Sequence, residues 1–331
     1  MKARMIDVAR MAGVSASTVS RRLSGSHLVS DDVGARIDAA VRALDYAPNA
    51  VASGLAGSRA RGRSRTVAVI VPALAAFAAM TDELMVQLES GGYQVMIAAT
   101  HYDAEREEAL VRALLSWSPA ALVMVGRCHS RAALQALLAD GLPVVEVGEL
   151  IDRPIDANIG FSHRAVGRTV ARHFLAAGAR RLGLAVVALP GDRRAADRAL
   201  GLREIAAEAD VPVIEHVSPE RATTRAGATA LADLMDRAEA PDAILCSNDL
   251  VALGALFEAG RRGLDLPRDL RLCGYGDFDF AAETPVPLSS VRPPDREIAR
   301  EAAALLLARF AGRAPPPPAD TDFTHLVRGT G

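Results

Sequence analysis

The 331-residue chain has one lysine, three cysteines and no long apolar run. Cys128, Cys246 and Cys273 are odd in number and widely spaced, which favours reduced core thiols over disulfides or metal ligands, and a cytoplasmic protein. A membrane span needs about 18 consecutive apolar residues, and no run reaches that length. The first ten residues also lack the apolar segment of a signal peptide. The sequence therefore predicts a protein that stays inside the cell and away from membranes.

Motifs of several enzyme classes are also missing. The apolar stretch 69–77 has no glycine-rich turn of the kind that binds dinucleotides. The chain contains no G-x-S-x-G elbow, paired Cys-x-x-Cys motif or H-E-x-x-H helix. Its Asp and Arg residues are scattered, without a recognisable nucleophile and base. We therefore expect no catalytic residues, no cofactor and no metal.

The charge of the chain is unevenly distributed, although the net charge is only −2. Residues 1–65 hold eleven Lys or Arg and five Asp, a local balance of +6 that leaves −8 for the remainder. A basic amino-terminal segment indicates an anionic partner. Lys2 is the sole lysine, so arginine carries the charge, and arginine suits bidentate contacts with phosphate and guanine. A GC-rich genome would produce the same preference for arginine.

Three short helical patterns occupy the first 46 residues. Gly13 ends the first, where its freedom at positive φ allows a sharp turn. Ser15 is expected to cap the second, in which Val19 and Leu23 face inward. Ser30 is expected to cap the third, which has a single apolar stripe. Two helices separated by a tight turn predict a helix-turn-helix that enters the major groove of DNA.

The second of these helices presents small polar residues and an arginine on its outer face. Ser15, Ser17 and Thr18 can reach phosphates or base edges near the start of the helix. The guanidinium group of Arg21 can donate two hydrogen bonds, to O6 and N7 of guanine. The alternative is an ordinary three-helix cap on a larger fold.

From residue 66 onward, apolar runs alternate with amphipathic helices such as 104–117 and 195–209. Such alternation predicts parallel sheets covered on both faces, and the number of runs favours two doubly wound lobes with a cleft between them. The PPPP segment at 315–318 is interpreted as a spacer before a last strand near 323–329. The eight expected strands are 66–72, 93–99, 120–126, 143–148, 181–189, 211–217, 242–247 and 270–276.

Residues 5–55 resemble the amino-terminal domain of the LacI family of bacterial transcription regulators, and the resemblance continues to the end of the chain. It implies an α/β protein with a helix-turn-helix headpiece at 1–47 and a hinge helix and linker at 48–65. A two-lobed, periplasmic-binding-protein-like (type I) domain of doubly wound parallel sheets follows at 66–331. It also implies a homodimer on pseudo-palindromic operator DNA, under allosteric control by a small effector. No long heptad tail follows residue 312, so a dimer rather than a tetramer is expected.

The resemblance assigns roles in DNA binding to individual residues. A helix beginning at Pro48 would fold when two protomers meet on an operator, with Asn49 contacting DNA and Leu55 wedged into the minor groove. Ser53 stands where the family often has arginine. Ala16 and Ser17 hold the positions that usually read bases, and both side chains are small. Arg21 is therefore expected to carry much of the direct readout.

The resemblance also implies an effector pocket lined by strand ends of both lobes. A mixture of arginines and carboxylates suits a polyhydroxylated ligand that carries a carboxylate or phosphate. A structural role is equally open for each residue taken alone; Asp249, for example, could simply cap a helix. The residues carried over are Phe77, Arg194, Arg198, Asn248, Asp249 and Asp279.

Segments 114–147 and 273–293 are similar to the gluconate-utilisation repressors of this family. Gly276 stands where many relatives have a sugar-binding aspartate, so Asp277 or Asp279 is a candidate substitute. Arg127 and His129, just past a strand end, are candidates for contacting an acidic sugar. His163 stands where many relatives have asparagine and is either a pocket donor or a surface residue.

These features together predict a transcriptional regulator, and specifically a repressor of sugar or sugar-acid catabolism genes. Its effector would be gluconate or a related acid, with phosphorylated derivatives and neutral sugars left open. The alternative is a cytoplasmic sugar-binding or sugar-processing protein whose helical cap does not bind DNA.

Overall fold

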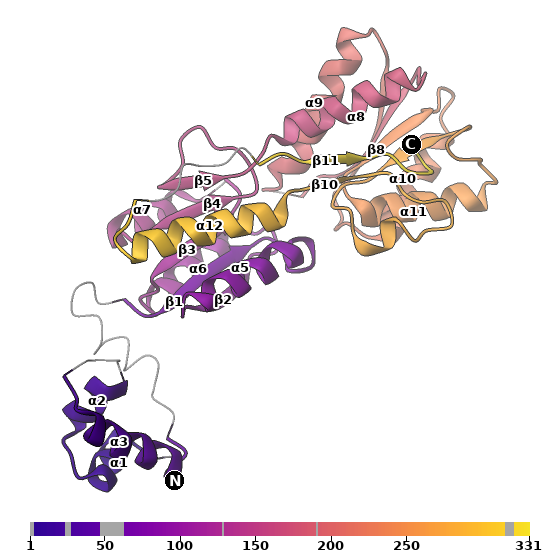
Figure 1. The fold of residues 1–331 in the computed structure, drawn as a ribbon. Coiled ribbons are helices and arrows are strands. Elements are labelled where there is room, and N and C mark those ends of the chain that lie inside the picture. Colours follow the sequence, from indigo (N-terminus) through magenta and orange to yellow (C-terminus); the bar gives the residue numbers. More distant parts are fainter. Residues whose placement is uncertain (1–2, 24–27, 47–62, 128, 190, 315–320) are drawn as a thin grey trace.

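The computed structural model describes residues 3–23, 28–46, 63–127, 129–189, 191–314 and 321–331. The predicted hinge helix, including Pro48, Asn49 and Leu55, lies outside these ranges. Figure 1 shows the short helices at the amino terminus, followed by two α/β lobes. Within the described ranges, every helix is too short or too polar to traverse a lipid bilayer.

The three amino-terminal helices enclose a small apolar core of their own. The helices are α1 (Met5–Ala12), α2 (Ala16–Leu23) and α3 (Asp31–Ala43). Val8, Val19 and Ile37, one from each helix, are completely buried in this core. The turn after α1 closes at Gly13, whose φ of +65° is the left-handed conformation predicted from the sequence. The helix-turn-helix is therefore confirmed.

The two predicted caps differ in the structure. Ser15 accepts a hydrogen bond from the backbone N–H of Thr18 at 3.2 Å, as a capping side chain does. Ser30 does precede α3, but its side chain makes no capping hydrogen bond. An ion pair between Arg22 and Asp38, at 2.6 Å, instead ties α2 to α3.

The amino-terminal lobe has a five-stranded parallel sheet in the order β2-β1-β3-β4-β5. Its strands are β1 (Thr66–Val71), β2 (Gln94–Ala99), β3 (Ala121–Val125), β4 (Val144–Val147) and β5 (Ala157–Ile159). Its helices are α5 (Ala78–Ser90), α6 (Ala104–Leu115), α7 (Arg131–Asp140) and α12 (Asp295–Phe310).

The carboxyl-terminal lobe has a four-stranded parallel sheet in the order β7-β6-β8-β9. Its strands are β6 (Leu182–Val187), β7 (Val213–Ser218), β8 (Ala243–Cys246) and β9 (Arg271–Cys273). Its helices are α8 (His163–Ala176), α9 (Arg193–Glu208), α10 (Thr224–Met235) and α11 (Asp249–Arg261).

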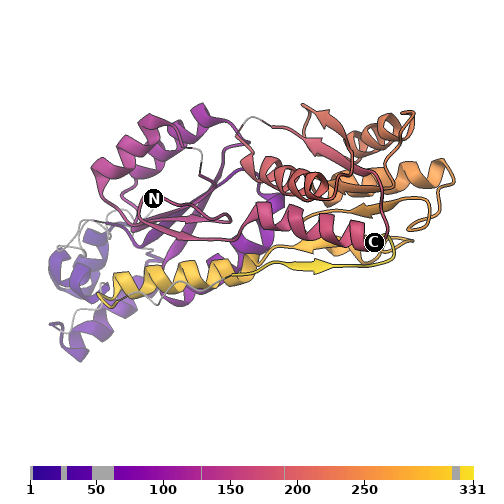
Figure 2. The ribbon, with the colours of Figure 1, turned by 90° about the horizontal axis from the view of Figure 1, so that it is seen from above.

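The chain passes between the lobes more than once. It enters the carboxyl-terminal lobe after β5, and it returns through β10 (Ser290–Arg292) into α12, which packs against α5. The last strand, β11 (Thr324–Leu326), pairs antiparallel with β10. Figure 2 shows α12 along one lobe and β11 reaching toward the other. The two lobes are therefore joined by more than one segment of the chain.

Close helix contacts fix the position of α9, which carries two of the predicted pocket arginines. Gly167 of α8 faces Gly201 of α9 so closely that a Cβ at Gly167 would lie 1.9 Å from the backbone oxygen of Arg198. A Cβ at Gly201 would lie 2.0 Å from the backbone oxygen of Arg164. Glycine is therefore required at this crossing.

The predicted α/β class with two doubly wound lobes is confirmed. All eight long apolar runs form parallel strands, and the final strand is present. Strands β5 and β10 were not predicted because their three-residue segments, Ala157–Ile159 and Ser290–Arg292, include polar residues and form no apolar run. Cys246 and Cys273 are buried free thiols, and Cys128 lies outside the described ranges.

Candidate functional site

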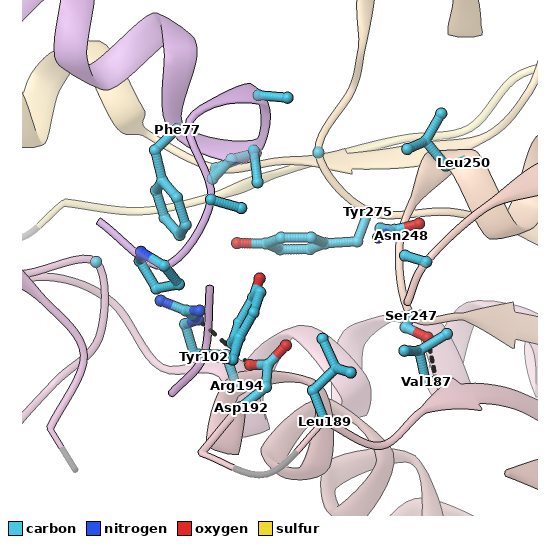
Figure 3. A pocket seen from close by; sticks show the side chains of 18 of the residues that line it. Phe77, Tyr102, Val187, Leu189, Asp192, Arg194, Ser247, Asn248, Leu250 and Tyr275 are labelled. Atoms are coloured by element: carbon cyan, nitrogen blue, oxygen red, sulfur yellow. Dashed lines mark hydrogen bonds and ion pairs between the residues drawn. The ribbon is translucent and has the colours of Figure 1, made fainter. Parts of the chain in front are cut away.

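A cavity of about 250 Å³ lies between the two lobes, where the carboxyl ends of their strands meet. Ligands of open parallel sheets bind at this edge. Phe77 and Tyr102 contribute aromatic walls from the amino-terminal lobe, and Tyr275 contributes one from the other lobe (Figure 3). Phe77, which the resemblance to the family placed in the effector pocket, lines the cavity.

Arg198 is held at the cavity by three neighbours. Its Nη1 lies 3.0 Å from Nδ1 of His163, and its Nη2 donates to the backbone oxygen of Ser247 at 2.8 Å. Its guanidinium carbon lies 3.8 Å from the centre of the Tyr275 ring, a cation–π contact. Burial lowers the pKa of this guanidinium, but arginine stays charged because its ordinary pKa is so high.

His163 is a buried cavity residue and not a surface residue. It is 3 % exposed and begins α8. Its Nε2 lies 3.1 Å from the backbone oxygen of Gly148, so Nε2–H donates there and Nδ1 accepts from Arg198. Burial and the neighbouring guanidinium of Arg198 hold the pKa of His163 well below its usual value. The imidazole is therefore neutral, and it connects the two lobes.

Arg194 also lines the cavity, one helical turn before Arg198. Its Nε lies 3.5 Å from a carboxylate oxygen of Asp192, and its guanidinium stacks over Phe77 at 4.9 Å. Among the residues described, none provides a hydrogen-bond acceptor for its buried Nη1. Asn248, also on the cavity wall, caps α11 by accepting from the N–H of Val251 at 3.0 Å. The cavity thus holds two buried arginines close to aromatic rings.

Arg127 and His129 do not line this cavity, contrary to the expectation from their strand-end positions. Arg127 is turned toward carboxylates: its Nε lies 3.1 Å from Glu149, and it also pairs with Asp197 of α9. This ion pair with Asp197 crosses from the amino-terminal to the carboxyl-terminal lobe. The positive charge of Arg127 is thereby engaged between the lobes.

The side chain of His129 is buried between two carboxylates. Its Nδ1 lies 2.8 Å from Glu107 and its Nε2 lies 3.2 Å from Glu146. Burial alone would lower the pKa of His129, but the hydrogen bonds to both carboxylates outweigh it and raise the pKa to about 9. His129 is thus a cation within the amino-terminal lobe and is separate from the cavity.

The predicted aspartates also lie outside the cavity lining. Asp249 is completely buried and accepts from the N–H of Phe278 at 2.8 Å and from the hydroxyl of Ser290 at 2.7 Å. Asp279 is exposed and accepts from the N–H of its neighbour Phe280. Asp249 therefore ties the loop after β9 to α11, and neither side chain substitutes for the carboxylate absent at Gly276.

Asp277 is likewise turned away from the cavity. It pairs with Arg292 at 2.6 Å and with Arg328 at 2.7 Å. The carboxylates that do line the cavity are Asp192 and Asp295.

Several cavity residues were missed by sequence reasoning. Tyr102 and Tyr275 follow the ends of β2 and β9, and Asp295 begins α12 directly after β10. The strand-end rule could have found the two tyrosines, because both strands were predicted. Asp295 gave no such signal, since β10 itself was not predicted.

The predicted DNA-contacting residues of the headpiece lie on α2 and just before it, between Ser15 and Arg21. Ser15, Ala16, Ser17 and Arg21 are exposed and Thr18 is half-buried. The hydroxyl of Ser15 lies 2.8 Å from the hydroxyls of both Ser17 and Thr18, so these groups also bond to one another. Asn49 and Leu55 lie outside the described ranges.

Comparison with known proteins matches both parts of the chain. Residues 4–49 match the bacterial regulatory proteins of the lacI family, and residues 171–330 match a periplasmic binding protein-like domain. The HTH-type transcriptional regulator GntR of Pseudomonas aeruginosa is 34% identical over 312 residues, which are 93% of this chain and 89% of that protein.

Two solved structures are similar over most of their length. A LacI family transcriptional regulator from Silicibacter pomeroyi has a TM-score of 0.88 at 30% identity and covers 99% of each chain. The transcription regulator GntR from Chromobacterium violaceum has a TM-score of 0.76 at 32% identity, covering 80% of this chain and 98% of that one. These relatives are transcriptional regulators, which favours that function over a sugar-binding or sugar-processing protein with a cap that does not bind DNA. The chain belongs to the lacI family of bacterial regulatory proteins and is a DNA-binding transcriptional regulator.

Proposed function

We propose that this protein is a dimeric repressor of sugar or sugar-acid catabolism genes, and that a sugar acid in the cleft cavity controls its affinity for a pseudo-palindromic operator. The observation that carries the proposal is the pair of buried arginines, Arg194 and Arg198, in a cavity between the two lobes. Guanidinium groups bind carboxylates through charge-assisted hydrogen bonds. Gluconate or a related acid is the proposed effector, in keeping with the relatives named GntR.

The proposed mechanism divides the chain into a headpiece (1–47), a hinge and linker (48–65) and an effector-binding and dimerisation domain (66–331). A ligand in the cavity contacts both lobes and therefore changes how far they close. Two contacts between the lobes respond to closure: His163 with Gly148, and Arg127 with Asp197. The change reaches the dimer contact and the hinge, so that the hinge helices no longer pair on the operator.

The allosteric coupling can be measured directly. We expect gluconate to weaken operator binding by roughly 5- to 150-fold, the usual range of about 1 to 3 kcal/mol. Fluorescence anisotropy with promoter DNA from the gene neighbourhood, with and without gluconate, measures this change. Operator DNA must weaken gluconate binding by the same factor, because coupling is reciprocal. Equal gluconate affinity with and without operator would disprove the allosteric mechanism.

Matched arginine variants test the role of the cavity. Arg194→Gln should abolish the response to gluconate while operator binding itself remains, because the headpiece is unchanged. Arg180→Gln, at an exposed position away from the cavity, is the control and should respond like the unmodified protein. A full response from the Arg194 variant would show that the acid binds elsewhere.

A second variant tests direct readout by the headpiece. Arg21→Ala should reduce discrimination at one base pair by about 1 to 3 kcal/mol if Arg21 contacts guanine. Arg10→Ala on α1 is the control for loss of one exposed positive charge. Equal weakening on all sequences would instead assign Arg21 to a phosphate contact.

A further inference from the structure

The carboxylate of Asp295 stands out among the charged groups of the cavity. It lines the cavity at the first residue of α12, and no hydrogen bond or ion pair joins it to any other described residue. Asp192, the other carboxylate of the cavity, is engaged by Arg194 and by the N–H of Ala195 at the start of α9. Asp295 is half-buried and its carboxylate faces the cavity, where the positive charge of Arg194 favours its ionised form. A ligand with hydroxyl groups would satisfy it.

The cavity also offers donors that lack acceptors. Nη1 of Arg194 and Nε of Arg198 are buried without a hydrogen-bond partner in the described part of the chain. Arginines 194, 198 and 221 give the lining three positive charges, and Asp192 and Asp295 give it two negative charges. These arginines and carboxylates together leave one positive charge in excess. A ligand with a single negative charge and several hydroxyl groups complements this arrangement.

We infer that Asp295 makes the cavity selective for a polyhydroxylated monocarboxylate and against its phosphate ester. This rests on the proposed function, and it names the discriminating residue and the ligand class. The acid group of the ligand binds to the arginines, and its hydroxyls donate to the carboxylate of Asp295. A phosphate ester would add about −2 in charge to the same ligand.

The discrimination follows from electrostatics in a cavity enclosed by both lobes. Like charges a few ångströms apart repel far more strongly in the protein than in bulk water. A phosphate brought near Asp295 would also leave that carboxylate without a hydroxyl donor. Burial raises the pKa of Asp295 to about 6, so the carboxylate is ionised at pH 8.

The test is isothermal titration of the full-length protein at pH 8 with D-gluconate, its 6-phosphate ester and D-glucose. We expect gluconate to bind at least about tenfold more tightly than either of the other two, as loss of one charge-assisted hydrogen bond would produce. Asp295→Asn should lower gluconate affinity about tenfold and reduce or remove the discrimination against the ester. Asp152→Asn, an exposed position outside the cavity, is the control and should match the unmodified protein.

The possible outcomes separate this inference from the proposed function. If the unmodified protein binds neither acid, the proposed function itself fails. If it binds gluconate, but Asp295→Asn leaves the ratio of the two affinities unchanged, the role of Asp295 is overturned and the proposed function stands. Equal binding of gluconate and its ester by the unmodified protein also overturns the inference. If Asp295→Asn does not fold, the ratio of the affinities for gluconate and its ester is compared between the unmodified protein and Asp295→Glu, which keeps the charge. That ratio then decides the outcome.

Discussion

Two buried histidine side chains, in different parts of the molecule, differ in charge: one is a cation and the other is neutral. In the amino-terminal lobe, both nitrogens of His129 donate to carboxylates, those of Glu107 and Glu146. At the cavity, His163 donates to a backbone oxygen and accepts from the guanidinium of Arg198. The pKa of His129 is accordingly raised to about 9, and the pKa of His163 is held well below its usual value.

The difference shows that burial alone does not decide the charge of a histidine. Burial lowers the pKa of both side chains, and the neighbouring charges then reverse that effect for His129 and reinforce it for His163. His129 is a fixed cation that holds β4, α6 and the loop after β3 together. His163 is a neutral connector between the lobes that also orients Arg198.

The largest expected effect is on the stability of the amino-terminal lobe. His129→Leu removes the cation and leaves Glu107 and Glu146 buried without a counter-charge. Breaking a buried ion pair in this way costs about 3 to 5 kcal/mol, so the free energy of unfolding in urea should fall by that amount. His216→Leu is the control: His216 pairs with the more exposed Asp233, and the loss should stay below about 1 kcal/mol. A similarly small loss at position 129 would mean that His129 is not charged.

The second prediction concerns pH. The folded-state pKa of His129 is about 9, above the unfolded value of 6.5, so its stabilising contribution is complete below pH 6.5 and is lost as the pH rises through 9. The size of this contribution is on the order of 3 kcal/mol. His163 should contribute nothing in that window, because its pKa lies below it.

The measurement compares two proteins at two pH values. The free energy of unfolding is determined at pH 7 and pH 9.5 for the unmodified protein and for His129→Leu. The unmodified protein should lose more stability between these pH values, since only it can lose the proton of His129. Equal losses would place the pKa of His129 near its ordinary value.

Much of the fold follows from sequence patterns, but the helix contacts do not. The eight predicted strands lie in runs of apolar residues, and most of these runs are separated by amphipathic helices. Nothing in the local sequence shows that Gly167 and Gly201 face each other across α8 and α9. The two glycines are 34 positions apart in the sequence, so they come into contact only when the lobe folds.

The cavity is predictable only in part, for a similar reason. Arg194, Arg198 and Asn248 line it, as the resemblance to the family implied. Arg127 and His129 follow a strand end as well, but nearby carboxylates on α6, α9 and the β4 segment bind them instead. Position along a strand thus predicts which edge of the sheet a residue occupies, and the neighbours brought by other elements decide where its side chain points.

The smallest expected effect comes from changing His163 while preserving its hydrogen bonds. Glutamine carries one donor and one acceptor, so His163→Gln can still donate to Gly148 and accept from Arg198. We expect it to change the free energy of unfolding by less than about 1 kcal/mol. His163→Leu leaves both partners unsatisfied and should cost about 1 to 3 kcal/mol, with weaker gluconate binding because Arg198 loses its orientation. Urea unfolding and isothermal titration of the two variants measure these effects. If His163→Gln lost as much stability as His163→Leu, the prediction would be wrong. The contact would then depend on the shape of the imidazole ring and not on its one donor and one acceptor.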